Sequence, residues 1–364
     1  MMMTSKTLAH GMVRAVGILV LIGLGLFVVY QIQTVLVYLV VAMIVSLIAN
    51  PITEFLRKKL KVPNTLAVAV TLLFFLALLL GLFSLFVPLI TAQGNNLSLL
   101  DTQAIQNKTI QLYTQIDQYL SRHHIDLGRI LKESNLTSKL KFNYFTDFVN
   151  TVFSTISSFG MGIVSVFFIS FFFLRDKVKW IVGIKKILPD KNETKILNSI
   201  DKIRTLLTRY FIGLLVQLTI ICLLYLIVLL IFGVENAFVI AFLCALLNVI
   251  PYIGPFIGSV LAGILTMLNN INHDFQTVTL PTTIYVLLGF FIVQMIDNNV
   301  SSPIIFSKSI HSHPLEIFLV ILIVGILFGI TGMIIAVPLY TILKVIGKEF
   351  FPDNKIIQVL TKNL

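Results

Sequence analysis

Residues 248–255 read Asn-Val-Ile-Pro-Tyr-Ile-Gly-Pro and lie at the centre of a long apolar run, Asn236–Leu268. That run contains 33 residues and no Asp, Glu, Lys or Arg. A continuous helix of this length would measure roughly 50 Å, whereas the hydrocarbon core of a membrane is about 30 Å thick. Because proline and glycine interrupt helices, the run is predicted to break or turn back at its centre.

A second overlong run, Pro314–Leu343, contains 30 residues with a single charge, Glu316. Gly325, Gly329 and Gly332 lie near its centre, so this run is also predicted to break there. Broken backbone at membrane depth persists only where protein buries it or where it lines a wet cavity, because lipid cannot hydrogen-bond its polar groups. Two interruptions of this kind are typical of a transport site.

The composition indicates a protein that crosses a membrane several times. Of its 364 residues, 57% are hydrophobic and only 12% are charged, which is rare in soluble domains. We expect no cleavable signal peptide, because the first apolar run lacks a small-residue cleavage site. Six further apolar runs are long enough to be spans: Ala15–Tyr30, Val35–Ala49, Leu66–Ile90, Phe148–Leu174, Phe211–Phe232 and Val278–Ile296.

The basic residues predict the topology of these spans. Of the 27 Lys and Arg residues, 20 fall on one side: near the N-terminus, in Pro51–Asn64, in Arg175–Arg209 and after the last run. The positive-inside rule makes that side the cytoplasm, with both termini inside. The net charge of +11 is thereby explained by topology, with attraction to anionic lipids as a secondary effect, and we expect no nucleic-acid partner.

Two polar segments are predicted to be amphipathic helices on opposite faces of the membrane. Residues 93–147 lie outside, where Leu112, Ile116 and Leu120 recur at helical spacing, and we expect a cap on the outer face or on neighbouring subunits. Residues 175–210 lie inside and contain a helix that Asp190 or Asn192 could cap, leading as an interfacial helix into the next span. We expect no metal site in either segment.

The charge rule also favours one arrangement of the overlong runs. If both cross completely, the connection Asn269–Thr277, which has no Lys or Arg, lies inside and Lys308 lies outside. If both enter and return on one side, Lys308 becomes cytoplasmic, which fits the rule better. The predicted fold is therefore an all-α polytopic membrane protein with about six full transmembrane helices, two re-entrant helical hairpins and amphipathic helices on both faces. The hairpin tips would approach each other near the bilayer centre.

The end of the seventh span gathers polar side chains. Gln294 lies one turn inside an apolar helix, where an amide needs a buried partner, so we weigh a site role for Gln294 and Asp297 equally against a structural one. Helix capping accounts for Asn298. Asp297 and Glu316 are candidates for ion coupling, but both lie near predicted ends of spans, where solvation is the simpler explanation.

At these motifs the chain resembles the autoinducer-2 exporter family of bacterial permeases over essentially its whole length. Phe173-Leu174-Arg175-Asp176 ends the fourth span as in that family. The other matching positions are Arg209-Tyr210, Gly213, Gly233, residues 248–255, Gln294, Asn298, Pro303, His313-Pro314, Gly325, Phe328-Gly329, Gly332 and Ala336-Val337-Pro338.

This resemblance implies an exporter in the bacterial inner membrane, built as a homopentamer, in which two hairpins carry a solute by an elevator-like movement. It places substrate-binding residues at the hairpin tips and beside them: Asn248, Pro251, Tyr252, Gly254, Pro255, Gln294, Phe328, Gly329, Thr331 and Gly332. These groups are amides, a phenol, a hydroxyl and backbone, which suit a small neutral polar solute such as autoinducer-2. We expect membrane lipids as further partners and no cofactor.

The resulting plan divides the chain into six parts: transmembrane helices 1–3 in 1–92, the outer segment 93–147, the fourth helix 148–174, the inner amphipathic helix 175–210, a transport core 211–346 with hairpins at 236–268 and 314–343, and a tail 347–364. Two alternatives stay open, a sodium/proton antiporter and a channel or membrane scaffold. An enzyme is not expected, because the sequence shows no zinc pair, phosphate loop or nucleophile elbow.

Overall fold

The computed structural model describes residues 5–91, 102–122, 162–189, 192–301 and 313–362, and every regular element in these ranges is helical. This agrees with the predicted all-α fold. The helices are α1 (Ser5–Gln31), α2 (Gln33–Lys59), α3 (Asn64–Thr91), α4 (Thr102–Arg122), α7 (Lys177–Ile187), α8 (Glu193–Ile231), α9 (Ala237–Leu247), α10 (Ile253–Asn269), η2 (Phe275–Thr279), α11 (Leu280–Ile296), η3 (Asp297–Ser301), α13 (Pro314–Phe350) and α14 (Lys355–Leu360).

Within the described ranges, four helical segments are long and apolar enough to cross a membrane: Thr34–Lys59, Asn64–Gly81, Glu193–Ile231 and Phe275–Ser301. Two further predicted spans contain shorter apolar helices, Val16–Gly25 and Gly162–Arg175. The chain divides into two compact units. The first unit comprises residues 1–72 and 158–180, and the second comprises residues 73–157 and 181–364.

The first unit is held together by small residues and short polar contacts. Ala42 of α2 is fully buried, and its carbonyl accepts a hydrogen bond from the Ser170 hydroxyl at 3.1 Å. The Thr53 hydroxyl contacts the Thr71 hydroxyl at 3.2 Å, which joins α2 to α3. Small side chains allow the backbones of membrane helices to approach closely, and hydroxyls then bond across them.

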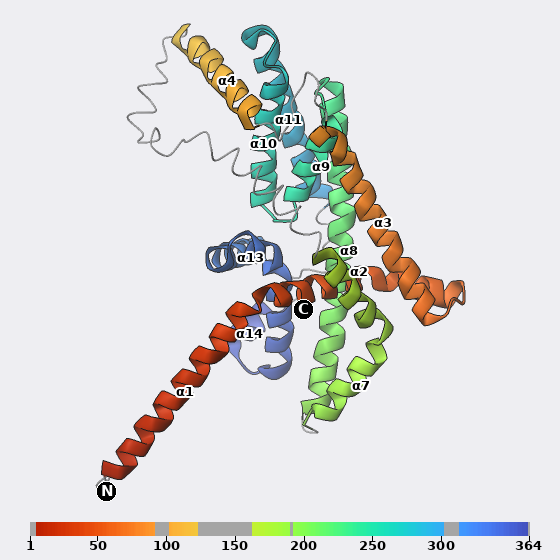
Figure 1. Cartoon of the computed structure of the whole chain (residues 1–364), viewed down its shortest axis with the longest axis vertical. Helices are drawn as coiled ribbons and strands as arrows, with labels where there is room; N and C mark the ends of the chain where they lie inside the picture. Colours follow the sequence, from red (N-terminus) through yellow and green to blue (C-terminus); the bar gives the residue numbers. More distant parts are fainter. Residues whose placement is uncertain (1–4, 92–101, 123–161, 190–191, 302–312, 363–364) are drawn as a thin grey trace. The chain divides into compact units, whose positions relative to one another are not determined.

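The second unit is built around α8, which contacts α9, α11 and α13. Figure 1 shows this long helix in green, with α9 packed beside part of it and α10 packed against α9. A buried cluster joins α8 to α9, α10 and α11, and within it Tyr225 stacks on Phe290 with ring centroids 3.9 Å apart. The predicted inner amphipathic helix and the following span form one continuous helix here. Asn192 precedes α8 but makes no capping hydrogen bond with its side chain, and Asp190 lies outside the described residues.

The first overlong run folds into a helical hairpin, α9 and α10, as predicted. Its two ends meet because Asn269 Nδ2 donates a hydrogen bond of 2.9 Å to the Glu235 carbonyl. A run that crossed the membrane completely would hold these two groups on opposite faces. The structure therefore supports entry and return on one side.

The second overlong run also folds back on itself. Gly329 takes φ 65° and ψ −151°, a conformation outside the helical region, and the two halves of α13 bend there (Figure 1). Beyond the bend, Met333 lies against Gly325. At the base, Tyr340 Oη donates to Glu316 Oε2 at 2.9 Å, and Lys344 Nζ lies 3.7 Å from the same oxygen. These contacts close the second hairpin.

Candidate functional site

Two polar side chains of α8 face the interior of the second unit. Gln217 is 7% exposed and Tyr225 is fully buried, although the surrounding helix is strongly apolar. A buried polar group costs free energy unless it is hydrogen-bonded, so each of these side chains requires a partner on a neighbouring element. Both partners come from the end of α11 and the π-helical turn η3 that follows it.

Gln217 binds Asp297, which is the first residue of η3. Gln217 Nε2 donates to Asp297 Oδ2 at 2.7 Å, and Asp297 is only 2% exposed. π-Helical turns are uncommon and occur frequently at functional sites, because the extra residue per turn redirects side chains. Here the π turn follows α11 directly and supplies a buried carboxylate to α8.

Tyr225 connects α8 to Gln294, near the end of α11. The Tyr225 hydroxyl lies 3.4 Å from Gln294 Oε1, and Gln294 Nε2 donates to Asn298 Oδ1 at 3.2 Å. The stacking of Tyr225 on Phe290 fixes the ring while its hydroxyl reaches the amides. The contacts form a chain of neutral donors and acceptors between two membrane helices.

The tip of the first hairpin joins this chain through Asn248. That residue ends α9, is 6% exposed and donates from Nδ2 to the Cys244 carbonyl at 2.9 Å. Its side chain also lies close to the Tyr225 hydroxyl. The polar cluster is therefore defined as Gln217, Tyr225, Asn248, Gln294, Asp297 and Asn298.

The turn between α9 and α10 has a geometry that its sequence explains. Tyr252 takes φ 66°, and a Cβ on Gly254 would lie 1.8 Å from the Leu247 carbonyl oxygen, so only glycine allows α10 to begin this close to α9. The Tyr252 ring is 46% exposed and meets the Phe318 ring edge-on at 6.0 Å. The tip thus presents a phenol beside the first half of α13.

The structure brings only some of the predicted substrate-binding residues close together. Asn248 and Gln294 come together through Tyr225, and Pro251 and Pro255 belong to the same tip and are half-buried. The tip of the second hairpin lies open: Phe328 is 66% exposed, and empty space adjoins Gly329. Gly332, in contrast, packs against Val324. The Thr331 side chain lies outside the described residues.

The two carboxylates that the sequence offers for ion coupling, Asp297 and Glu316, are not simply solvated at the ends of spans. Asp297 is buried rather than solvated, because η3 turns it towards Gln217. Glu316 is half-buried and paired with Tyr340 and Lys344 at the base of the second hairpin. Glu316 therefore has a structural partner, whereas Asp297 belongs to the polar cluster.

Sequence reasoning missed three members of the cluster. In the sequence, Gln217 and Tyr225 lie within an apolar span, and helix capping accounts for Asn298. The available signal was the amide of Gln217 in the middle of that span, since such a group needs a buried partner. Among the described residues, no group of three His, Cys, Asp or Glu side chains is arranged to hold a metal ion.

Comparisons with known proteins agree with this architecture. A family model described as "AI-2E family transporter" matches residues 17–351. The "Putative transport protein YueF" of Bacillus subtilis (strain 168) is 30% identical over 322 residues, which cover 86% of this chain and 83% of YueF. The "Putative permease PerM" of Escherichia coli (strain K12) is 38% identical over 69 residues, 19% of each chain.

Proposed function

The chain belongs to the AI-2E transporter family, and on that premise we propose that this membrane transporter exports a small neutral polar solute, autoinducer-2 or a molecule like it. The observation that carries the proposal is the polar cluster. It places four amides, a phenol and a carboxylate in an apolar unit, next to a broken helix, and all of these groups except those of Gln294 and Asn298 are buried. An ionisable residue inside a membrane unit marks a functional site by default, and broken helices with polar groups beside them are typical of transport sites.

The chemistry of the cluster favours a neutral cargo. Gln294, Asn298 and Asn248 each offer both donors and acceptors, and the Tyr225 hydroxyl can act as either. The carboxylate of Asp297 already accepts a hydrogen bond from Gln217. A hydroxylated solute can replace these contacts one for one, whereas a bare ion requires charges that these amides do not supply.

We propose that transport moves the two hairpins as an elevator-like body. Each hairpin is closed at its base, by Asn269 with the Glu235 carbonyl in the first and by Glu316 with Tyr340 and Lys344 in the second. Elements closed in this way can move without exposing unpaired backbone to lipid. The setting we propose is a bacterial inner membrane with both termini in the cytoplasm.

Uptake of labelled autoinducer-2 into inverted vesicles tests the cargo. Vesicles that contain the protein should accumulate the label above empty vesicles, and equal accumulation would exclude this cargo.

Movement is tested with Phe256→Cys and Phe328→Cys, because both side chains are highly exposed at the hairpin tips. A water-soluble thiol reagent should label both at rates that change with substrate, and constant rates would contradict the movement.

A second candidate function, cation/proton antiport, is favoured by the burial of Asp297. An ionisable group at depth can exchange a proton for a cation, and the amide of Gln217 would serve as its neutral neighbour. Asp297→Asn should then abolish sodium or lithium tolerance in a salt-sensitive host. Glu235→Gln, which changes an exposed carboxylate, is the control. Unchanged tolerance in the Asp297→Asn variant would remove this function.

A further inference from the structure

Helix α4 docks on the connection between α10 and α11. Leu112 of α4 is buried with Leu268 and Ile271, which are 2% and 3% exposed. Gln115 Nε2 donates to the Ile271 carbonyl at 3.1 Å, and the Tyr119 ring lies 5.5 Å from that of Phe275. These contacts place α4 and the connection on the same side of the membrane, which the charge distribution predicts to be extracytoplasmic.

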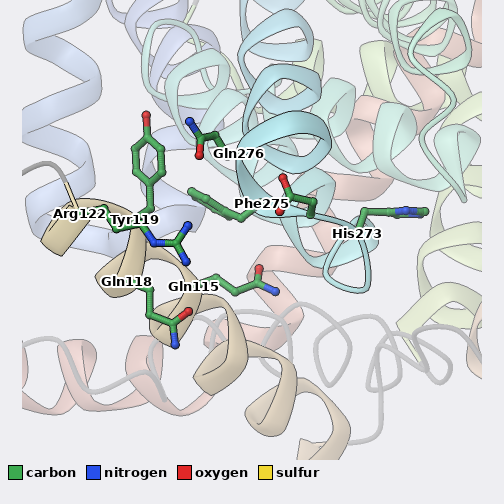
Figure 2. Close-up of a pocket in the computed structure, with 8 residues that line it drawn as sticks. Gln115, Gln118, Tyr119, Arg122, His273, Phe275 and Gln276 are labelled. Carbon is green, nitrogen blue, oxygen red and sulfur yellow. The ribbon is translucent and has the colours of Figure 1, made fainter.

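A pocket of about 190 Å³ lies at this junction (Figure 2). It is smaller than the 300–1,000 Å³ or so that drug-sized ligands occupy, so it fits only a small molecule. Figure 2 shows the Arg122 guanidinium between Tyr119 and Gln115, with Phe275 facing them, whereas the His273 ring points away. The pocket is lined by Gln115, Gln118, Tyr119, Arg122, His273, Asp274, Phe275 and Gln276.

One atom in this pocket needs a donor. In the part of the chain that the structure describes, Gln115 Oε1 is a buried oxygen without a hydrogen-bond partner. Leaving such an acceptor unsatisfied costs about 1–3 kcal/mol, and a ligand hydroxyl would recover that cost. The Nε2 atom of the same amide is held by Ile271, which fixes the direction in which Oε1 points.

The formal charges in the pocket balance. The hydroxyl and backbone N–H of Thr277 donate to Asp274 Oδ1, both at 2.8 Å, and with the nearby Arg122 guanidinium they hold the pKa of Asp274 below its usual value. Asp274 is therefore ionised at neutral pH, and its charge offsets that of Arg122. A net anion or cation gains little from such a pair, whereas a neutral solute can bond to both groups.

We propose that this pocket is a second binding site, for a small neutral polyhydroxylated solute about the size of a pentose. Hydroxyl groups of the solute donate to Gln115 Oε1 and accept from Arg122, and its apolar face rests on the rings of Tyr119 and Phe275. The site is separate from the polar cluster and does not depend on what the transporter carries. It binds solute at the outer end of the first hairpin.

The test is saturation-transfer NMR with D-ribose on the purified full-length protein. Wild-type protein should give a saturable signal, and Gln115→Leu and Arg122→Gln should each weaken binding by about tenfold. Gln111→Leu, which changes an exposed amide on the same helix, is the matched control. Arg122→Gln leaves the apolar contacts of α4 in place, so the result does not depend on Gln115→Leu retaining the docked helix.

Further variants and one other probe separate this site from its alternatives. Asn248→Leu, which alters the polar cluster, should leave the ribose signal unchanged. A signal that vanishes in Asn248→Leu but persists in both pocket variants would overturn the proposal, because ribose would then bind in the polar cluster. Saturable binding of the zwitterion glycine in place of ribose would also overturn it, since a neutral polyol would not be the preferred class.

Discussion

At the scale of single residues, position 254 shows how one side chain controls the hairpin. A methyl group on Gly254 would overlap the Leu247 carbonyl oxygen, which is backbone and cannot rotate away. Position 183 provides the opposite case, because a Cβ on Gly183 would meet nothing within 4 Å. The same substitution therefore has opposite effects at the two sites.

We expect Gly254→Ala to destabilise the protein by about 1–3 kcal/mol, the usual cost of forcing extra volume into a packed site. Gly183→Ala should be neutral or stabilising by up to about 1 kcal/mol, because alanine favours helix. Thermal unfolding in detergent measures both variants. Equal melting temperatures for Gly254→Ala and wild type would contradict the close approach of α9 and α10.

The buried contact between Gln217 and Asp297 leads to a second residue-scale prediction. Gln217→Leu removes the donor from a buried carboxylate, which should cost about 1.5–3 kcal/mol of stability. Adding Asp297→Asn should recover part of this loss, because the neutral amide is easier to bury without a donor. Unfolding of the single and double variants measures the coupling, and strictly additive losses would argue against a direct bond.

At the scale of elements, the ion pair of Glu316 and Lys344 closes the base of the second hairpin. Glu316→Gln keeps an acceptor for Tyr340 but leaves the nearly buried Lys344 without this carboxylate, so we expect a loss of about 1–3 kcal/mol. The double variant Glu316→Gln, Lys344→Met should be closer to wild type in its melting temperature. A double variant that is less stable than either single variant would show that this pair does not hold the hairpin.

The docking of α4 is tested by hydrogen exchange. Leu112→Asp puts a charge into the cluster with Leu268 and Ile271, so α4 should detach and its amides should exchange at least about tenfold faster. Gln111→Asp, at an exposed neighbouring position, should leave exchange unchanged. Equal protection of α4 in both variants would mean that the helix does not depend on this contact.

The elements differ in how far the sequence could predict them. Proline and glycine at the midpoints, with the position of Lys308, were enough to predict both hairpins. The continuity of α8 was hidden, because the polarity of its first half suggested a separate helix at the membrane surface. The pairing of Gln217 with Asp297 joins residues far apart in the chain through a π turn, and local patterns carry no information about such a contact.

At the scale of the whole molecule, the six residues of the polar cluster lie inside the second compact unit. The cluster draws on α8, the tip of the first hairpin and the end of α11, so three elements must fold together before the site exists. Sequence comparison places nearly the whole chain in a transporter family. The polar cluster is the part of the chain where we propose that the transported solute binds. The open tip of the second hairpin leaves room for rearrangement around it.

We also propose that the protein assembles as a homopentamer, on the basis of the family resemblance. Native mass spectrometry from detergent should give a mass about five times that of the 40.8 kDa chain. Cross-linking in intact membranes should give the same stoichiometry, which guards against dissociation during purification. A monomer by both methods would contradict the assembly.

The central claim is that the polar cluster binds the transported solute. Its most direct test is the initial rate of autoinducer-2 uptake into inverted vesicles by Tyr225→Phe, which removes one hydroxyl and keeps the stacking on Phe290. Thr219→Val, which removes an exposed hydroxyl from the same helix, is the control. We predict at least about a fivefold fall for Tyr225→Phe and no change for Thr219→Val. Equal rates for wild type and Tyr225→Phe would contradict the claim.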